Sequence, residues 1–261
     1  MRIEMERVEI PSDFVTLPGG VRVNLYNTDE VRALRSGAAS DQLMQTVDWC
    51  ENFLGKPSGL MGRSGNVCPF VPEAMMRGSL KFAIVRLNSR GEAAIGEIEE
   101  IVTAFREHFL ENEKAQGKID IFGSWVMVFP DVSPEEASRV IDVPQRDLKP
   151  SFVKEGLMIG EFHPLSPSPG LRSLAFRPLR SPIPLLAVRH MVESDIDFLS
   201  RPLDPPLIRI QSLKAYLQFL GSSMSIANQI KAKEALKAAE AEADQAIDNE
   251  PACAAAHPIA G

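Results

Sequence analysis

The sequence predicts an α+β fold: a single domain with a mixed sheet flanked by helices over residues 1–221, and a C-terminal helical extension over 222–261. Short β-rich apolar runs alternate along the chain with segments of helical periodicity, an order typical of a sheet covered by helices. The 261 residues are 44% hydrophobic and 24% charged, which is an ordinary globular balance. The extension is mostly Ala, Glu and Lys, so a helix is favoured there but a large core is not.

The first half of the sequence alternates predicted strands and helices. "VRVNLY" (21–26) follows an "LPGG" turn and alternates apolar and polar residues, which predicts a short strand. Residues 40–55 and 89–113 predict helices, because apolar residues recur there at spacings of three and four. Residues 79–87 form a β-rich apolar run and predict a strand. Residues 55–78 are rich in Gly and Pro but also in Met, Phe and Val, so they predict an ordered loop packed on the core.

The second half continues this alternation. A polar cap followed by a proline predicts a helix over 133–141. The Ala/Glu/Lys-rich sequence from residue 222 predicts a projecting helix, and its end, "PACAAAHPIAG", predicts a disordered tail. The remaining expected elements are strands at 125–130, 156–162 and 183–191 and helices at 194–200 and 207–221.

Charge and composition disfavour several classes of partner. A net charge of −7 provides no overall basic field for nucleic acid or for an anionic membrane. No apolar run approaches the roughly 20 residues of a membrane span, and the charged N-terminus resembles no secretory signal. Cys50, Cys68 and Cys253 form no CxxC pair and no even-numbered framework, which is typical of the reducing cytoplasm. We therefore expect a cytoplasmic protein whose partners are a small-molecule substrate and a second copy of itself.

Several catalytic motifs do not occur in the sequence. It has no GxGxxG after a predicted strand, no phosphate-binding GxxxxGK[ST] loop, no HExxH and no GxSxG. It also has no Hx[DE] pair of the kind that begins a facial-triad iron site. Standard nucleotide-dependent and hydrolytic enzymes are therefore disfavoured.

Two of the four histidines stand where a site is expected. His163 and His190 each end an apolar run, where the end of a strand presents side chains to a cleft. Histidine is the usual neutral metal ligand and the usual proton carrier near neutral pH. The alternative for each is a loop histidine that bonds to backbone. His108 is expected at the surface or boundary of the long helix, and His257 in the tail.

Arginines and a cysteine complete the candidate set. Between the two histidines lie Arg172, Arg177, Arg180 and Arg189, in a segment that prolines hold extended. Guanidinium groups bind carboxylates bidentately, so this cluster suits an acidic substrate or cofactor, and structural ion pairs are the alternative. Cys68 either ligates iron as a thiolate or is buried as a small apolar residue.

The order of these motifs resembles that of known families. A "CPF" loop, a strand and a long helix, "WVMVFPD", "IGEFHP" with "PGLRS", and "IPLLAVRHMVESDIDFL" follow one another over residues 60–200. The chain is similar to a group of uncharacterised bacterial proteins with "CPFVP" and "GEFHP" signatures. More distantly, it resembles the YqcI/YcgG family, which includes the haem-dependent N-hydroxylase of guanitoxin biosynthesis.

The distant resemblance rests on three short motifs. Cys68 with Pro69 matches a cysteine–proline loop. A His-Pro motif followed by arginine is matched by His163, Pro164 and Arg172. A short strand that ends in a histidine before an aromatic residue is matched by His190 and Phe198. Two features depart from the pattern. The cysteine precedes its proline here, and "SPSPGLR" replaces the Ser-Arg pair that follows His-Pro in the family.

The resemblance implies a haem-dependent oxygenase or N-hydroxylase of a small amino-acid-like substrate in bacterial specialised metabolism. His163 would ligate the iron, with His190 or Cys68 as the alternative ligand. His190 would otherwise donate a hydrogen bond to bound oxygen, and Glu161 would orient the imidazole or hold a cationic substrate group. The residues expected to hold the haem propionates or a substrate carboxylate are Arg172, Arg180 and Arg189.

Two other functions stay open at this point. The chain fits a non-catalytic accessory or binding protein of a biosynthetic cluster, in which the Ala/Glu/Lys helix serves assembly. It also fits a mononuclear non-haem metal enzyme that uses Cys68, His163 and His190, although their spacing matches no zinc signature.

Overall fold

The structure, a computed structural model, describes residues 13–202 and 204–248. The chain divides into two compact units. The first comprises the described residues up to Phe152 together with Leu157–His190, and the second comprises Val153–Gly156 and the described residues from Met191 onward. The predicted division at residue 222 stays a prediction, and the predicted disordered tail at 251–261 lies outside the described residues.

The first unit is built on a five-stranded mixed sheet, which confirms the predicted α+β class. Its strand order is β3-β4-β5-β7-β6, in which β4 and β5 run parallel and every other neighbouring pair is antiparallel. The two strands β1 (Phe14–Thr16) and β2 (Arg22–Asn24) form a separate small sheet. The strands of the large sheet are β3 (Tyr26–Asn27), β4 (Leu80–Ile84), β5 (Ser124–Val128), β6 (Leu157–Phe162) and β7 (Leu185–His190).

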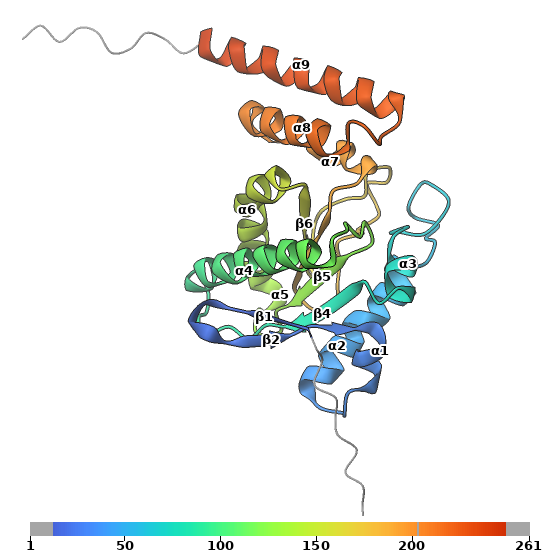
Figure 1. Cartoon of the computed structure of the whole chain (residues 1–261), viewed down its shortest axis with the longest axis vertical. Coiled ribbons are helices and arrows are strands. Elements are labelled where there is room, and N and C mark those ends of the chain that lie inside the picture. Colours follow the sequence, from blue (N-terminus) through green and yellow to red (C-terminus); the bar gives the residue numbers. More distant parts are fainter. Residues whose placement is uncertain (1–12, 203, 249–261) are drawn as a thin grey trace, which may run out of the picture. The chain divides into compact units, whose positions relative to one another are not determined.

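Helices cover both faces of this sheet (Figure 1). Successive side chains of a strand point to opposite faces, so Trp125 and Met127 join one core cluster while Val126 and Val128 join the other. The first cluster includes residues of α4 (Ala93–Gln116), α5 (Pro134–Val140) and α6 (Asp142–Lys154). The second includes residues of α1 (Thr28–Ala33), α2 (Ala38–Trp49), a π-helical turn at Cys50–Leu54, and α3 (Val71–Met76).

Several elements differ from the sequence prediction. The single strand expected at 21–26 is two strands in different sheets, separated at Leu25, which is buried and donates its N–H to the Asp13 carbonyl (2.9 Å). The loop expected at 55–78 contains α3, which has Pro72 in its first turn. Helices α1 and α6 were not expected. In α6, polar residues and the internal Pro150 hide the apolar periodicity.

The second unit is helical. It contains a 3₁₀ turn (Glu193–Asp195), α7 (Ile196–Leu199), α8 (Pro206–Leu220) and α9 (Ile226–Asp248), and α9 packs along α8. The Glu193 carboxylate accepts the Ser225 backbone N–H (2.9 Å) just before α9 begins, and the hydrogen bonds from Ser225 and Asn228 lower its pKa. The Tyr216 hydroxyl donates to the Glu193 carbonyl (2.7 Å). Burial and nearby acidic groups raise the pKa of Tyr216 to about 12.

The helices within residues 13–202 and 204–248 do not combine the length and apolar character that a bilayer crossing requires.

Candidate functional site

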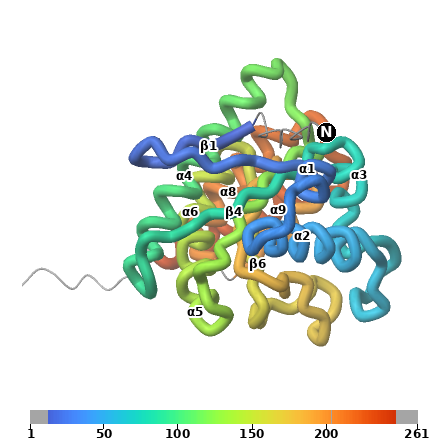
Figure 2. The backbone as a smooth tube through the Cα atoms, turned by 90° about the horizontal axis from the view of Figure 1, so that it is seen from below, coloured from blue at the N-terminus to red at the C-terminus, as the bar shows by residue number. Residues whose placement is uncertain are grey.

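Two loops that are about a hundred residues apart in the sequence meet in the first unit. They are residues 57–67, just before "CPFVP", and residues 163–182, which begin at the histidine of "GEFHP"; together they are called the loop pair. A Cβ atom built on Gly62 would lie 3.0 Å from the Arg172 carbonyl oxygen, so the two backbones are in contact. Phe53 and Phe176 pack beside this contact, with ring centroids 5.9 Å apart. Figure 2 shows the second loop in gold, beside the end of α2.

Backbone hydrogen bonds close both loops. In the first, Pro57 and Asn66 form an isolated antiparallel bridge, and the Cys68 N–H donates to the Leu54 carbonyl (2.8 Å). In the second, the His163 N–H donates to the Leu179 carbonyl (3.1 Å), which joins the two ends of the loop. The loops are therefore ordered surfaces, which is where binding residues are commonly found.

The sequence predicted that His163 faces a cleft. In the structure this residue is buried at the start of the second loop. Its side chain is 0% exposed, and its Nε2 atom lies 3.3 Å from Oδ1 of Asp142, the first residue of α6. Its Nδ1 atom has no hydrogen-bond partner among the described residues. Burial raises the pKa of Asp142, and the neighbouring imidazole partly opposes this shift.

His190 stands at the opposite end of the same pair of strands. His190 pairs with Leu157, and His163 comes six residues after Leu157, so the two histidines are separated by about six residues of strand, roughly 20 Å. The His190 imidazole contacts the Glu113 carboxylate of α4, and its ring lies 5.2 Å from that of Phe109. The predicted arrangement, with both histidines facing one cofactor, is therefore not what the structure shows.

The other predicted residues divide between the same two ends. Arg172 and Arg180 are exposed on the loop pair, and Cys68 follows its first loop. Arg189 is half-buried in β7 and donates to the His190 carbonyl (2.8 Å). Glu161, half-buried in β6, stands near the end of the strand that leads into the second loop.

The two cysteines of the first unit favour the structural alternative. Burial, with a contribution from the Cys68 thiol, raises the pKa of the Cys50 thiol well above its usual range. Cys68 is half-buried against the same core cluster. A buried thiol with a raised pKa is a poor nucleophile and a poor thiolate ligand, so Cys50 acts as a small core residue.

The arginines of the loop pair are not structural ion pairs. None of Arg63, Arg172, Arg177 and Arg180 lies in ion-pair contact with a carboxylate among residues 13–202 and 204–248. Three of them instead donate to carbonyl oxygens of their own loops: Arg63 to Val67 (3.0 Å), Arg177 to Phe176 (3.1 Å) and Arg180 to Ser166 (3.1 Å). Neither loop contains Asp or Glu. The loop pair is thus a locally cationic surface on an acidic chain.

Exposed leucines accompany these arginines, and sequence reasoning missed them. Leu60 is 63% exposed and Leu174 is 81% exposed, and both lie within two residues of the Gly62–Arg172 contact. Leu165 and Leu171 are also exposed. The signal available in the sequence was that these leucines stand among loop-forming residues. They belong to no apolar stripe of a helix or strand, so they are not expected in the core.

The described residues do not bring together the three predicted ligands of a mononuclear metal site. Among them, no three His, Cys, Asp or Glu side chains gather as metal ligands. The proposed set of Cys68, His163 and His190 does not assemble, because His190 lies at the far end of the strands. Two surface cavities of about 320 and 430 Å³ are lined by none of these three residues. Haem binding and oxygenase activity stay predictions of the distant resemblance.

The fold and this site define an α+β protein with a cationic, leucine-bearing loop pair. A family described as a domain of unknown function, DUF6875, matches residues 43–231, and the chain belongs to this family. No curated protein matches the chain, and no solved structure matches it. Membership of an uncharacterised domain family is confirmed at this level, whereas no link to the YqcI/YcgG family is found.

Proposed function

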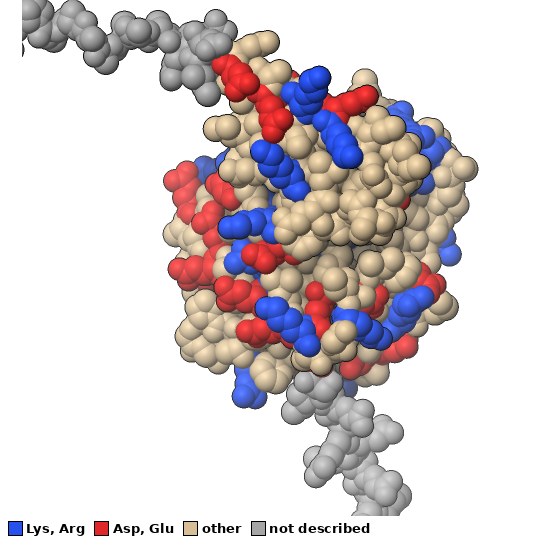
Figure 3. All heavy atoms as spheres, turned by 45° about the horizontal axis from the view of Figure 1, so that its top comes forward, with Lys and Arg blue, Asp and Glu red and all other residues tan. Residues whose placement is uncertain are grey.

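We propose that this chain is a non-catalytic accessory protein that binds an acidic partner protein through the loop pair. The observation that carries the proposal is a set of four arginines that have no carboxylate partner among the described residues. They stand on two touching loops that contain no acid, in a chain of net charge −7. On the face that Figure 3 presents, acidic and basic side chains are interspersed.

The residue types of the loop pair suit a protein interface. Arginine is enriched at such interfaces, where it forms planar, bidentate contacts with carboxylates. Exposed leucines next to the Gly62–Arg172 contact supply apolar area to bury. Complementary charge would steer an acidic partner toward this surface and fix its orientation.

The rigidity of the loops favours a protein over a lipid surface. Arg63, Arg177 and Arg180 are held by carbonyls of their own loops, and prolines restrict the second loop. Side chains that are already ordered lose little entropy when they meet one defined partner. Attraction to an anionic bilayer needs no such order, because it depends mainly on the number of basic residues near the surface.

The experiment compares the full chain with two double variants of equal chemistry. Arg172→Gln/Leu174→Ser changes the loop pair, whereas Arg35→Gln/Ile119→Ser changes an exposed arginine and an exposed apolar residue elsewhere. Each immobilised protein is exposed to lysate of the source organism at low and high salt, and retained proteins are quantified by mass spectrometry. The acidic protein that wild type retains is then purified, and its Kd is measured against all three chains.

The expected result is a partner whose affinity falls by about tenfold or more in the loop variant, stays unchanged in the control variant and weakens with salt. Equal affinity for the loop variant and wild type would overturn the proposal. Loop-dependent binding only to phosphatidylserine vesicles, with no retained protein, would also overturn it and assign the surface to a membrane.

A further inference from the structure

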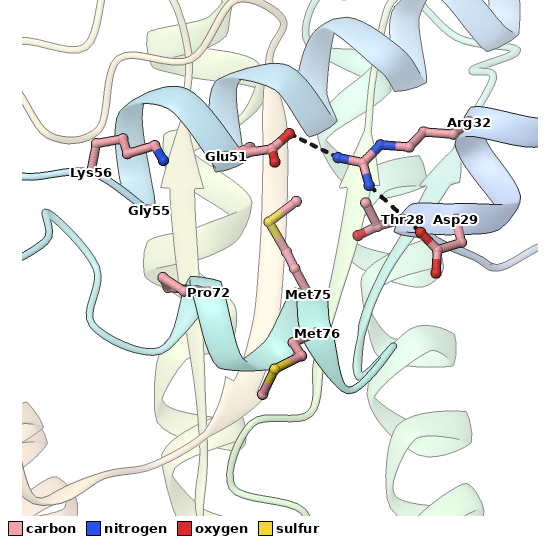
Figure 4. A pocket seen from close by; sticks show the side chains of 9 residues that line it. All are labelled: Thr28, Asp29, Arg32, Glu51, Gly55, Lys56, Pro72, Met75 and Met76. Carbon is pink, nitrogen blue, oxygen red and sulfur yellow. Dashed lines mark hydrogen bonds and ion pairs between the residues drawn. The ribbon is translucent and has the colours of Figure 1, made fainter.

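A separate cavity of about 320 Å³ lies between α1, the π-helical turn and α3 (Figure 4). Its size falls at the lower end of the range typical of small-molecule sites. None of its lining residues belongs to the loop pair, so a ligand site here would be independent of the proposed docking surface. The residues that line it are Thr28, Asp29, Arg32, Glu51, Gly55, Lys56, Pro72, Met75 and Met76.

Two acids hold one of its two cations in place. The Arg32 Nη2 atom donates to Glu51 Oε2 (2.8 Å), and its Nη1 atom lies 3.5 Å from Asp29 Oδ1. The acids of the cavity are therefore already engaged with a cation, while Arg32 keeps further N–H donors.

The second cation of the cavity stands apart from these acids. Figure 4 draws Lys56 and Arg32 on opposite sides of Glu51, with the Lys56 ammonium turned toward the other lining residues. Lys56 is exposed and has no ion-pair partner in the described part of the chain. Its charge is available to an anion.

A buried hydroxyl in the wall of the cavity has no partner. Thr28 is only 3% exposed, and its Oγ1 atom forms no hydrogen bond among the described residues. Buried polar groups are nearly always hydrogen-bonded, so an unpartnered hydroxyl in a cavity wall indicates a position for a polar ligand atom. Met75, Met76 and Pro72 provide an apolar wall, and methionine adapts readily to ligand shape.

We propose that this cavity binds a small organic carboxylate with an apolar body. The carboxylate is placed at the Lys56 ammonium, beside a Glu51 side chain that Arg32 already neutralises. The Thr28 hydroxyl donates to the bound molecule from the wall of the cavity, directly or through a water. The apolar body packs on Met75 and Met76. An amine lacks a comparable place, because Arg32 already occupies both acids.

The test uses the full chain with ¹³C-methyl methionine and follows the Met75 and Met76 signals by NMR, assigned with Met75→Leu and Met76→Leu. The probes are 4-methylpentanoate, its neutral alcohol 4-methylpentanol, and 3-methylbutylamine. We expect saturable shifts of both signals with the carboxylate only. The affinity should fall about tenfold in Lys56→Gln, because a charge-assisted contact is lost. It should fall severalfold in Thr28→Val and stay unchanged in Lys118→Gln, an exposed lysine outside the cavity.

Three results would each overturn the proposal. The first is the lack of any saturable shift up to about 10 mM carboxylate, well above a millimolar Kd. The second is equal binding of the amine or the alcohol. The third is unchanged carboxylate affinity in Lys56→Gln, whose exposed position leaves the fold unaffected. None of these results bears on the loop pair, because no variant used here changes it.

Discussion

The two ends of the β6–β7 strand pair place the same residue type in different environments. At one end, β7 ends at His190, whose imidazole contacts the Glu113 carboxylate and packs against the Phe109 ring. At the other end, β6 leads into the loop pair, and His163 is buried with its nearest carboxylate at 3.3 Å. The comparison teaches that a histidine at the end of a strand does not mark a site by itself. What distinguishes the His163 end is the loop above it.

The largest expected effect is a difference in the free energy of unfolding that is lost when each of the two histidines is replaced by leucine. His190→Leu leaves the Glu113 carboxylate, only 15% exposed, without its partner, and we expect a loss of about 3 kcal/mol in the free energy of unfolding. His163→Leu should cost less, because the imidazole Nδ1 has no partner among the residues that the structure describes and Asp142 is 34% exposed to water. Urea unfolding of both variants measures the difference, and an equal or larger loss in His163→Leu would contradict it.

A smaller effect tests whether the loops of the His163 end support each other. Gly62 has a φ of +73°, and an added Cβ would meet the Arg172 carbonyl oxygen at 3.0 Å. Gly91 has a φ of +59°, and an added Cβ there would meet no heavy atom within 4 Å. Gly91→Ala therefore introduces the strain of a positive φ but no steric contact. We expect Gly91→Ala to cost about 1 kcal/mol and Gly62→Ala measurably more.

Thermal and urea unfolding of these two alanine variants would isolate the contact between the loops. Identical losses would mean that the loops touch without holding each other in place. The loop pair would then be less rigid than the proposed docking surface requires.

The strands and the longest helix could be predicted because their signals are local. The apolar stripe through Ile98, Val102 and Phe105 marks α4 within one stretch of sequence. Helix α6 was missed because polar residues and prolines dilute its stripe, and α3 because it begins inside a Gly- and Pro-rich run. Each miss reflects tertiary packing that stabilises a helix with a weak local pattern.

The site was predictable only in its parts. The arginines of 172–180 stood out because they are concentrated in an acidic chain. That His163 and His190 lie at opposite ends follows from the antiparallel pairing of β6 with β7, and strand direction leaves no mark on local periodicity. The meeting of Gly62 with Arg172 joins segments about a hundred residues apart, which local periodicity does not relate.

The smallest expected effect concerns the charge next to His163. Burial raises the pKa of Asp142 above its usual 3.8, so the folded state holds this proton more tightly than the unfolded state does. The contribution of Asp142 to stability therefore falls as pH rises through the interval above 3.8. Asn cannot ionise, so the free energy of unfolding of Asp142→Asn should rise relative to that of wild type as pH increases from about 4 to 7. The rise should be less than about 1 kcal/mol, because water screens the carboxyl.

Urea unfolding at several pH values measures this gain, with the exposed Asp48→Asn as the control that should show none. If the stability of Asp142→Asn relative to wild type grows with pH, the ionised Asp142 carboxylate destabilises the folded state. His163 then does not compensate for its burial. A loss that grows with pH would contradict this, and would make the His163–Asp142 contact a stabilising one, as we expect the contact of His190 with Glu113 to be. The two ends of the strand pair would then differ only in the loops that cover them.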